Sequence, residues 1–330
     1  MYFSTHFFDI YILMAKIKQV ILYLFVYLIV VPNIMGQQEP RMSQNMLLPI
    51  VYNPAATGLS DGVDVTLVSR TQWAGAKDYA GNSIAPQTFF ITGDALIPAF
   101  GGGISMIILN EKYTPITQTK LRLNYAYHIK LKKGGLQLGL MTGLTDQSLD
   151  VGKIQAEDPG DPFLAALQKE SSSMNFDAGV GVFYAIPNKL YVGLSAMQLM
   201  ATKARYKTGY VVYQDALSVN LSGKYIFSPT YRPEWQFEPS TLMSFSRGIY
   251  QMDLNFLVRY NKKVWGGVGY RINDAIIAMI GFKIQEFKLA YSYDISTTPM
   301  RNGGTHEISL QYFFKIDYNK KRSYRNTRYL

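Results

Sequence analysis

Apolar and polar side chains alternate along most of this chain, from about position 63 to position 315. Within residues 120–130 every odd position is apolar or aromatic, and the even positions include Lys, Arg, Asn and His. The same two-residue period returns in 250–260, 287–295 and 307–315. A period of two is that of a β-strand with one apolar and one polar face, so the pattern predicts an all-β chain.

The alternating runs predict about fourteen strands, because turn residues interrupt the pattern at intervals along the chain. The expected strands span 63–72, 86–96, 101–110, 117–130, 135–145, 174–185, 189–198, 214–228, 234–246, 249–260, 263–272, 275–285, 286–296 and 304–315.

Strand length and aromatic residues distinguish a membrane barrel from a soluble β-sandwich, which also alternates. The predicted strands are about 10 to 14 residues long, whereas strands of soluble proteins average about 5 to 6 and tilted membrane strands need about 9 to 11. The apolar faces often begin or end with Tyr, Trp or Phe, as the interfacial girdle of a membrane barrel requires. We therefore expect a single transmembrane antiparallel β-barrel, which an even strand number allows to close without an exposed edge.

The lengths of the connections give a second indication. With both termini in the periplasm, the outer connections include the long 73–85, 146–173, 199–213 and 297–303, and most inner ones are short turns, apart from the somewhat longer 229–233. Long outer and short inner connections are typical of outer-membrane barrels. Several predicted strands also place glycine on the polar face, where it permits bending and close internal packing: Gly139, Gly143, Gly179, Gly181, Gly267 and Gly269.

The N-terminus has the pattern of a secretory signal. An apolar run of about 12 residues follows two lysines and precedes Pro32 and Gly36; it is shorter than the roughly 20 residues of a spanning helix. We expect cleavage after Gly36, with Met14 as an alternative start and an uncleaved anchor helix as the alternative interpretation.

The expected organisation is a signal peptide at 1–36, a periplasmic N-terminal segment at 37–62, the barrel at 63–315 and a basic periplasmic tail at 316–330. The N-terminal segment either lies below the barrel or enters its lumen.

Composition agrees with an exported membrane barrel. The chain has 330 residues and no cysteine, which excludes disulfides, thiolate metal sites and cysteine nucleophiles. Mean hydropathy is −0.02, well below that of a helical membrane protein, although 14% of residues are aromatic. A barrel combines both properties, because only alternate strand residues meet lipid.

Several motifs resemble one family in a shared order along the mature chain. They are Met42-Ser-Gln44, Val51-Tyr-Asn-Pro-Ala-Ala-Thr-Gly58, Arg70-Thr-Gln-Trp73, Tyr125-Ala-Tyr127, Asp161-Pro-Phe163, Leu190-Tyr-Val-Gly-Leu194, Trp265-Gly-Gly-Val-Gly-Tyr-Arg271, Ala290-Tyr-Ser-Tyr-Asp294 and Gly304-Thr-His-Glu-Ile308. Their order resembles that of the PorP/SprF family of type IX secretion system outer-membrane proteins from Bacteroidetes. Ala56, Thr57 and the long basic tail depart from the family pattern.

The resemblance implies a role in protein secretion and, in some members, gliding motility. Family members are thought to sit beside the periplasmic ring and lipoprotein subunits of the machine, or to hold the C-terminal domain of a large secreted adhesin at the cell surface. The partner-binding residues expected on this basis are Asn53, Pro54, Arg70 and Trp73. The positive charge of the tail adds Lys320, Lys321 and Arg322, which suit anionic headgroups or an acidic periplasmic partner.

The residues themselves argue against an enzyme. After signal removal only His128 and His306 remain, and they are predicted at opposite ends of their strands, too far apart for a shared catalytic site. The acidic residues of 146–161 do not have the spacing of a calcium-binding EF-hand loop, and Gly101-Gly-Gly103 lacks the lysine of a phosphate-binding loop. We therefore predict no catalytic set, no metal and no cofactor.

Charged residues on the inward face predict a polar network inside the barrel: Arg122, Glu238, Asp253, Arg259, Lys288 and Asp294. Such a network either lines a water channel or closes the lumen by pairing, and we expect a mostly occluded lumen. The alternatives are a small-molecule channel or transporter, and an outer-membrane enzyme. The net charge of +10 is assigned to the signal and the tail rather than to nucleic-acid binding, which the exported location excludes.

Overall fold

The structure, a computed structural model, describes residues 40–78, 81–150, 172–201, 203–205, 211–246, 248–297 and 303–315. The expected signal peptide and basic tail, with Lys320, Lys321 and Arg322, lie outside the described residues. No helix within the described ranges has the length and apolar character needed to cross a membrane.

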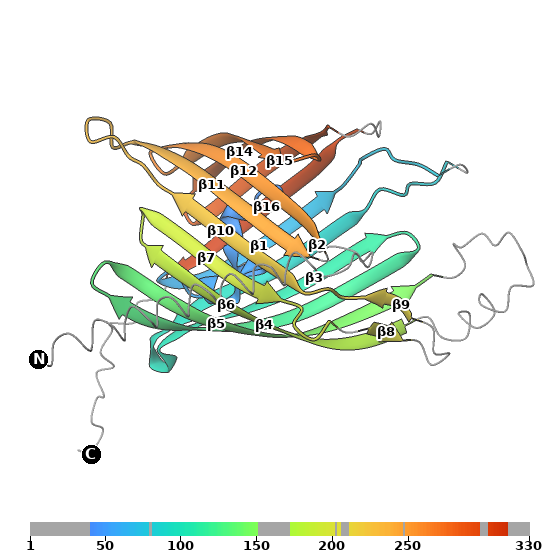
Figure 1. The fold of residues 1–330 in the computed structure, drawn as a ribbon. Coiled ribbons are helices and arrows are strands. Elements are labelled where there is room, and N and C mark those ends of the chain that lie inside the picture. Colours follow the sequence, from blue (N-terminus) through green and yellow to red (C-terminus); the bar gives the residue numbers. More distant parts are fainter. Residues whose placement is uncertain are drawn as a thin grey trace, which may run out of the picture.

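Fourteen strands form a closed antiparallel barrel, as the alternation predicts (Figure 1). In chain order they are β1 (Gly62–Thr71), β2 (Gln87–Ile97), β3 (Gly102–Tyr113), β4 (Ile116–Leu131), β5 (Gly134–Leu149), β6 (Ser172–Ile186), β7 (Leu190–Met197), β10 (Ser218–Tyr225), β11 (Trp235–Ser246), β12 (Ile249–Tyr260), β13 (Val264–Arg271), β14 (Ala275–Ile284), β15 (Phe287–Ser296) and β16 (Thr305–Lys315). The first and last strands pair and close the ring.

Closure brings the two ends of the barrel chain together. Gly62, which begins β1, pairs with Lys315, which ends β16. We call this side of the barrel the terminal end and the opposite side the loop end. Short turns join the strands at the terminal end, among them the 3-10 turn η3 (Pro98–Phe100). The strands that flank the long connections 72–86, 150–171 and 198–217 end and begin at the loop end, as predicted.

Two details of the strands differ from the prediction. The expected strand 214–228 is shorter at both ends, because β10 covers only Ser218–Tyr225. The expected connection 199–213 instead contains β8 (Lys203–Arg205) and nearly all of β9 (Val211–Gln214), which form a separate two-stranded sheet. The neighbours β3, β4, β5 and β6 have 12, 16, 16 and 15 residues and continue the ladder beyond the predicted bounds. Alternation along one strand locates that strand, but the strand ends where hydrogen bonding to its neighbour ends. The sequence pattern of a single strand does not show that point.

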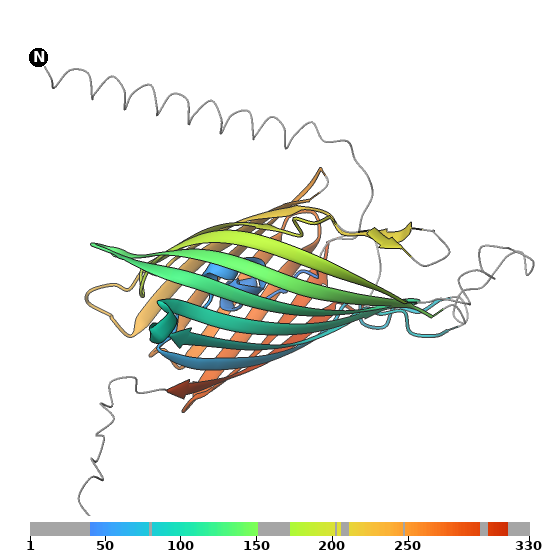
Figure 2. The ribbon, with the colours of Figure 1, turned by 90° about the horizontal axis from the view of Figure 1, so that it is seen from below.

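The two faces of the barrel wall follow the alternation. Leu123, Leu140, Val268 and Ile280 on the outer face are all at least half exposed, as lipid-facing residues of an isolated barrel must be. On the same strand as Leu123, the side chains at even positions point inward and are buried: Lys120, Arg122 and Asn124. Figure 2 shows that the interior also holds a short run of helical turns enclosed by the strands. These turns come from the residues that precede β1.

Candidate functional site

The most extensive site in the described structure is the lumen, which residues 40–61 fill. We call these residues the lumenal segment. It contains the 3-10 turn η1 (Asn45–Leu47), the short helix α2 (Pro49–Tyr52) and the 3-10 turn η2 (Pro54–Ala56). The sequence left a periplasmic and a lumenal position open for this segment, and the structure places its described part inside the barrel.

Local sequence explains why the lumenal segment turns so tightly. Proline begins both α2 and η2, where its fixed backbone angle suits a first helical position and its missing N–H costs nothing. Asn53 joins the two turns: its side-chain oxygen accepts a hydrogen bond from the N–H of Ala55 at 2.9 Å. The expected Asn-Pro turn is therefore present and is stabilised by an N-terminal cap.

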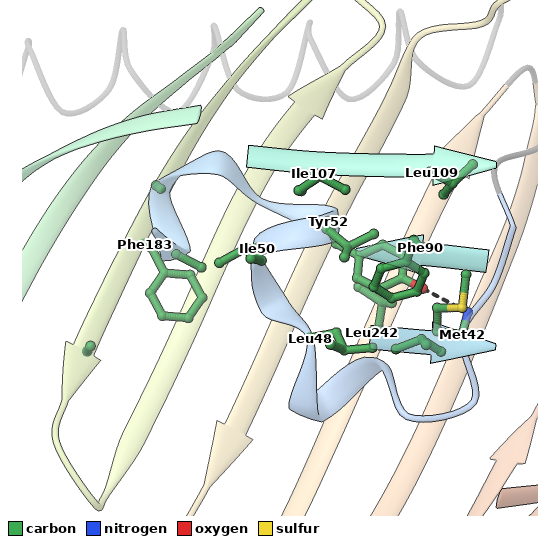
Figure 3. Packing of buried hydrophobic residues seen from close by; sticks show 14 residues of the cluster. Met42, Leu48, Ile50, Tyr52, Phe90, Ile107, Leu109, Phe183 and Leu242 are labelled. Atoms are coloured by element: carbon green, nitrogen blue, oxygen red, sulfur yellow. Dashed lines mark hydrogen bonds between the residues drawn. The ribbon is translucent and has the colours of Figure 1, made fainter. Parts of the chain in front are cut away.

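An apolar cluster packs the lumenal segment against the wall. Met42, Leu48 and Tyr52 are all less than 7% exposed, and the Tyr52 hydroxyl accepts a hydrogen bond from the N–H of Met42 at 2.9 Å (Figure 3). Burial of these side chains removes apolar surface from water, the main favourable term in folding. The wall side of the cluster comes from five strands, β1, β2, β3, β6 and β11, through Val68, Phe90, Ile107, Leu109, Phe183, Ala185 and Leu242.

Buried ion pairs hold the first part of the lumenal segment near the loop end. Glu307 accepts hydrogen bonds from the backbone N–H groups of Ser43 and Gln44, at 2.8 and 2.9 Å. The Arg70 guanidinium lies 3.0 Å from Glu307 and 3.2 Å from Asp294. The charge-assisted hydrogen bonds to Glu307 satisfy the backbone N–H groups of Ser43 and Gln44, which would otherwise be buried without a partner.

A second arginine continues this cluster along the wall. Arg271 is 1% exposed and donates to Asp253 at 2.7 Å and to the carbonyl of Met42 at 3.3 Å. Arg41 of the lumenal segment reaches the same Asp253 carboxylate at 3.3 Å. We call this group the loop-end cluster; it matches three guanidinium groups with three carboxylates: Arg41, Arg70, Arg271, Asp253, Asp294 and Glu307.

The last part of the lumenal segment lies against glycines near the terminal end. Asn53 donates to the carbonyls of Val182 in β6 and Leu194 in β7 at 3.0 and 3.2 Å. A Cβ added at Gly181 would lie 2.1 Å from the Asn53 side-chain oxygen, and one at Gly139 would lie 2.1 Å from the Ala55 nitrogen. The predicted inward glycines thus let two strands touch the backbone turn η2 directly.

A second charged group lies at the terminal end, away from the loop-end cluster. Glu238 accepts from Lys224 at 2.8 Å and from Arg259 at 2.8 Å, and Arg259 lies 4.9 Å over the ring of Trp265. Lys288 donates to Gln311 at 3.1 Å. We call Lys224, Glu238 and Arg259 the terminal-end cluster.

The predicted network residues Arg122, Glu238, Asp253, Arg259, Lys288 and Asp294 all lie on the inward face, but they form separate groups. Arg122 is buried in a third place, on β4. Glu307 and Arg271, the principal anchors of the lumenal segment, were not among the predicted network residues. Their positions on the polar face of alternating strands were the available signal.

The predicted partner-binding residues have mixed surroundings. Asn53, Pro54 and Arg70 are buried within the barrel, where they contact the wall or the lumenal segment, and they are not part of the described surface. Trp73 is half-buried at the loop end, in the turn after β1, and its backbone N–H donates to the Thr305 hydroxyl at 3.2 Å.

The two histidines occupy opposite ends of the barrel. His128 contacts the carbonyl of Thr57 at 2.9 Å near the terminal end, and His306 contacts the Tyr291 hydroxyl at 2.8 Å near the loop end. Among the described residues, no group of three or more His, Asp or Glu side chains is arranged to hold a metal ion.

A closed antiparallel barrel with an apolar outer face is an integral protein of the outer membrane. The chain belongs to the PorP/SprF family of type IX secretion system membrane proteins, whose family model matches residues 34–312. The resemblance read from the sequence motifs is thereby confirmed.

Solved structures of other outer-membrane barrels are similar in fold but distant in sequence. The Ralstonia pickettii toluene transporter TbuX is 11% identical, with a TM-score of 0.48 over 80% of this chain and 93% of that one. The Pseudomonas putida toluene transporter TodX is 10% identical, with a TM-score of 0.48 over 87% and 100%. An Acinetobacter baumannii outer membrane protein is 8% identical, with a TM-score of 0.45 over 78% and 100%. The comparison with curated proteins found no match.

Proposed function

We propose that this chain is a non-enzymatic component of the type IX secretion and gliding machinery that binds periplasmic ring subunits, tethers a secreted adhesin at the cell surface, or does both. Membership of the family supports the secretion role. The observation that favours this role over transport of a small molecule is the filled lumen. Apolar packing and polar contacts anchor the lumenal segment near both ends of the barrel.

The terminal end and the loop end of the barrel carry different candidate residues for binding partners. The predicted basic residues Lys320, Lys321 and Arg322 come after β16 in the sequence, and β16 ends at the terminal end. Their charge suits an acidic periplasmic partner. Trp73 lies at the loop end, among the long connections, and suits a partner at the cell surface. Tryptophan is among the residues that most often dominate the binding energy of protein interfaces.

Affinity capture from detergent extract tests the proposal with one variant at each end. Neutralising Lys320, Lys321 and Arg322 to Gln is expected to lose the ring subunits, and Trp73→Ala is expected to lose the secreted protein. Matched controls are Lys262→Gln with Lys263→Gln, in an exposed turn of the terminal end, and Trp235→Ala. Recovery of neither partner by the unmodified protein contradicts the proposal.

A small-molecule channel or transporter is the alternative function. The polar inward faces of the strands are compatible with a water-filled channel, but the lumenal segment occupies the space that a solute would need. Ion conductance, considered in the Discussion, separates the two functions.

A further inference from the structure

A cavity of about 120 Å³ lies between the lumenal segment and the wall strands β6, β7, β10 and β11. One side is formed by the lumenal segment and the other by the inward face of the barrel. The residues around it include Phe183, Tyr191, Ser222, Lys224, Ser240 and Leu242.

Most of the cavity wall is apolar. Met46 and Leu242 contribute aliphatic surface, and the rings of Phe183 and Tyr191 lie 6.4 Å apart and are tilted by 44°. Cavities lined in this way favour an apolar group over water, because water finds too few hydrogen-bonding partners there. An aromatic ring or a short acyl chain is the kind of group that suits this part of the cavity.

The remaining wall carries a positive charge. Lys224 of the terminal-end cluster lines the cavity, and its ammonium is 2.8 Å from Glu238. Glu238 is shared with Arg259, also at 2.8 Å, so two cations face one carboxylate. The ammonium has three N–H donors, of which one Glu238 oxygen takes one. The cluster therefore keeps one positive charge in excess beside an apolar space.

A serine hydroxyl provides a second polar contact. Ser240 lies between Glu238 and Leu242 on the inward face of β11 and lines the cavity. Its oxygen is buried and has no hydrogen-bond partner among the described residues. An unpartnered buried hydroxyl is costly unless a bound molecule or water completes it.

We propose that this cavity binds a small apolar carboxylate, with the apolar group between Phe183, Tyr191 and Leu242 and the carboxylate on Lys224, within reach of Ser240. The proposal concerns a ligand of the barrel and does not depend on its secretion partners. Apolar lining, an excess cation and an unpartnered hydroxyl converge on one class of ligand, since a neutral apolar molecule leaves both polar groups unused.

Binding is measured by isothermal titration of the full-length protein in lipid nanodiscs, which avoids detergent in the cavity. The probe is 3-phenylpropanoate, and its uncharged counterpart is 3-phenylpropanol. The carboxylate is expected to bind with a Kd of about 1 mM, as ligands of this size allow, and about tenfold more tightly than the alcohol.

Three variants distinguish this site from unspecific binding. Lys224→Met is expected to reduce the affinity for the carboxylate to that for the alcohol, and it leaves Glu238 paired with Arg259. Lys262→Met, which removes an exposed lysine in the β12–β13 turn, is expected to change neither affinity. Ser222→Phe fills the cavity and is expected to abolish both.

Equal affinities for the two probes overturn the proposal, as does carboxylate binding that Lys224→Met leaves intact. The absence of any heat of binding at about 10 mM probe also overturns the proposal, because a site of this composition should be measurably occupied at that concentration. Folding of each variant is checked by its heat-dependent mobility in gel electrophoresis.

Discussion

Replacement of residues 42–58 by a Gly/Ser sequence of equal length is expected to turn a barrel that is silent in planar bilayers into an ion-conducting pore. The native residues fill the interior with side chains that are anchored at both ends of the barrel. A fourteen-stranded barrel is wider than the eight-stranded barrels whose interiors side chains alone can fill. Without the anchored turns, water and ions have a path along the charged inward faces.

The same recording distinguishes a closed barrel from a transporter. The unmodified protein is expected to show no conductance steps, and the replaced protein is expected to show discrete, lasting ones. A matched control replaces only residues 73–78, in the connection at the loop end, and should stay silent. Steady conductance of the unmodified protein would support the channel alternative, and silence of both proteins would mean that other residues close the lumen.

Glu307→Ala is expected to lower the free energy of unfolding by about 3 to 5 kcal/mol, the usual cost of breaking a buried ion pair by removing one partner. Glu307 is fully buried, and its loss removes one of the two ion pairs of Arg70, that with Glu307, and the acceptor of two backbone N–H groups. Urea titration in lipid vesicles, followed by tryptophan fluorescence, measures the change.

Asp274→Ala provides the matched control for Glu307→Ala. Asp274 also pairs with a buried arginine, Arg271, at 3.3 Å, but its own side chain is 30% exposed. Arg271 retains Asp253 at 2.7 Å when Asp274 is removed. Exposed pairs contribute about 1 kcal/mol or less, so this variant should unfold almost as the unmodified protein does. Similar losses for both variants would refute the anchoring role of Glu307.

The barrel could be predicted from sequence because its determinants are local. A lipid-facing strand must show apolar residues at every second position, and this pattern fixed the bounds of β12 without error and those of β13 to β16 within one residue. The later start of β10 was missed because residues 215–217 have a mix of apolar and polar side chains similar to that of the strand, although they are outside the ladder.

The lumenal contacts could not be predicted because their partners are remote in sequence. Ser43 and Glu307 are 264 positions apart, and Arg70 and Glu307 are 237 apart. Alternation shows that Arg70, Arg271 and Glu307 point inward, but it cannot show which residues meet there. The lumenal segment is short and is interrupted by three prolines, so it lacks the periodicity that would predict its burial. The inward glycines were the one sequence feature that anticipated close internal packing.

A disulfide between the lumenal segment and the wall tests most directly whether the segment occupies the lumen. The hydroxyls of Thr57 and Ser105 lie 3.1 Å apart, both residues are buried, and the chain has no cysteine of its own. Thr57→Cys with Ser105→Cys should form a disulfide in membranes and leave no thiol for alkylation after unfolding. The control pair, Thr57→Cys with the lipid-facing Met106→Cys, should leave two free thiols. Two free thiols in the first pair, or equal crosslinking in both, would contradict a lumen filled by its own N-terminal segment.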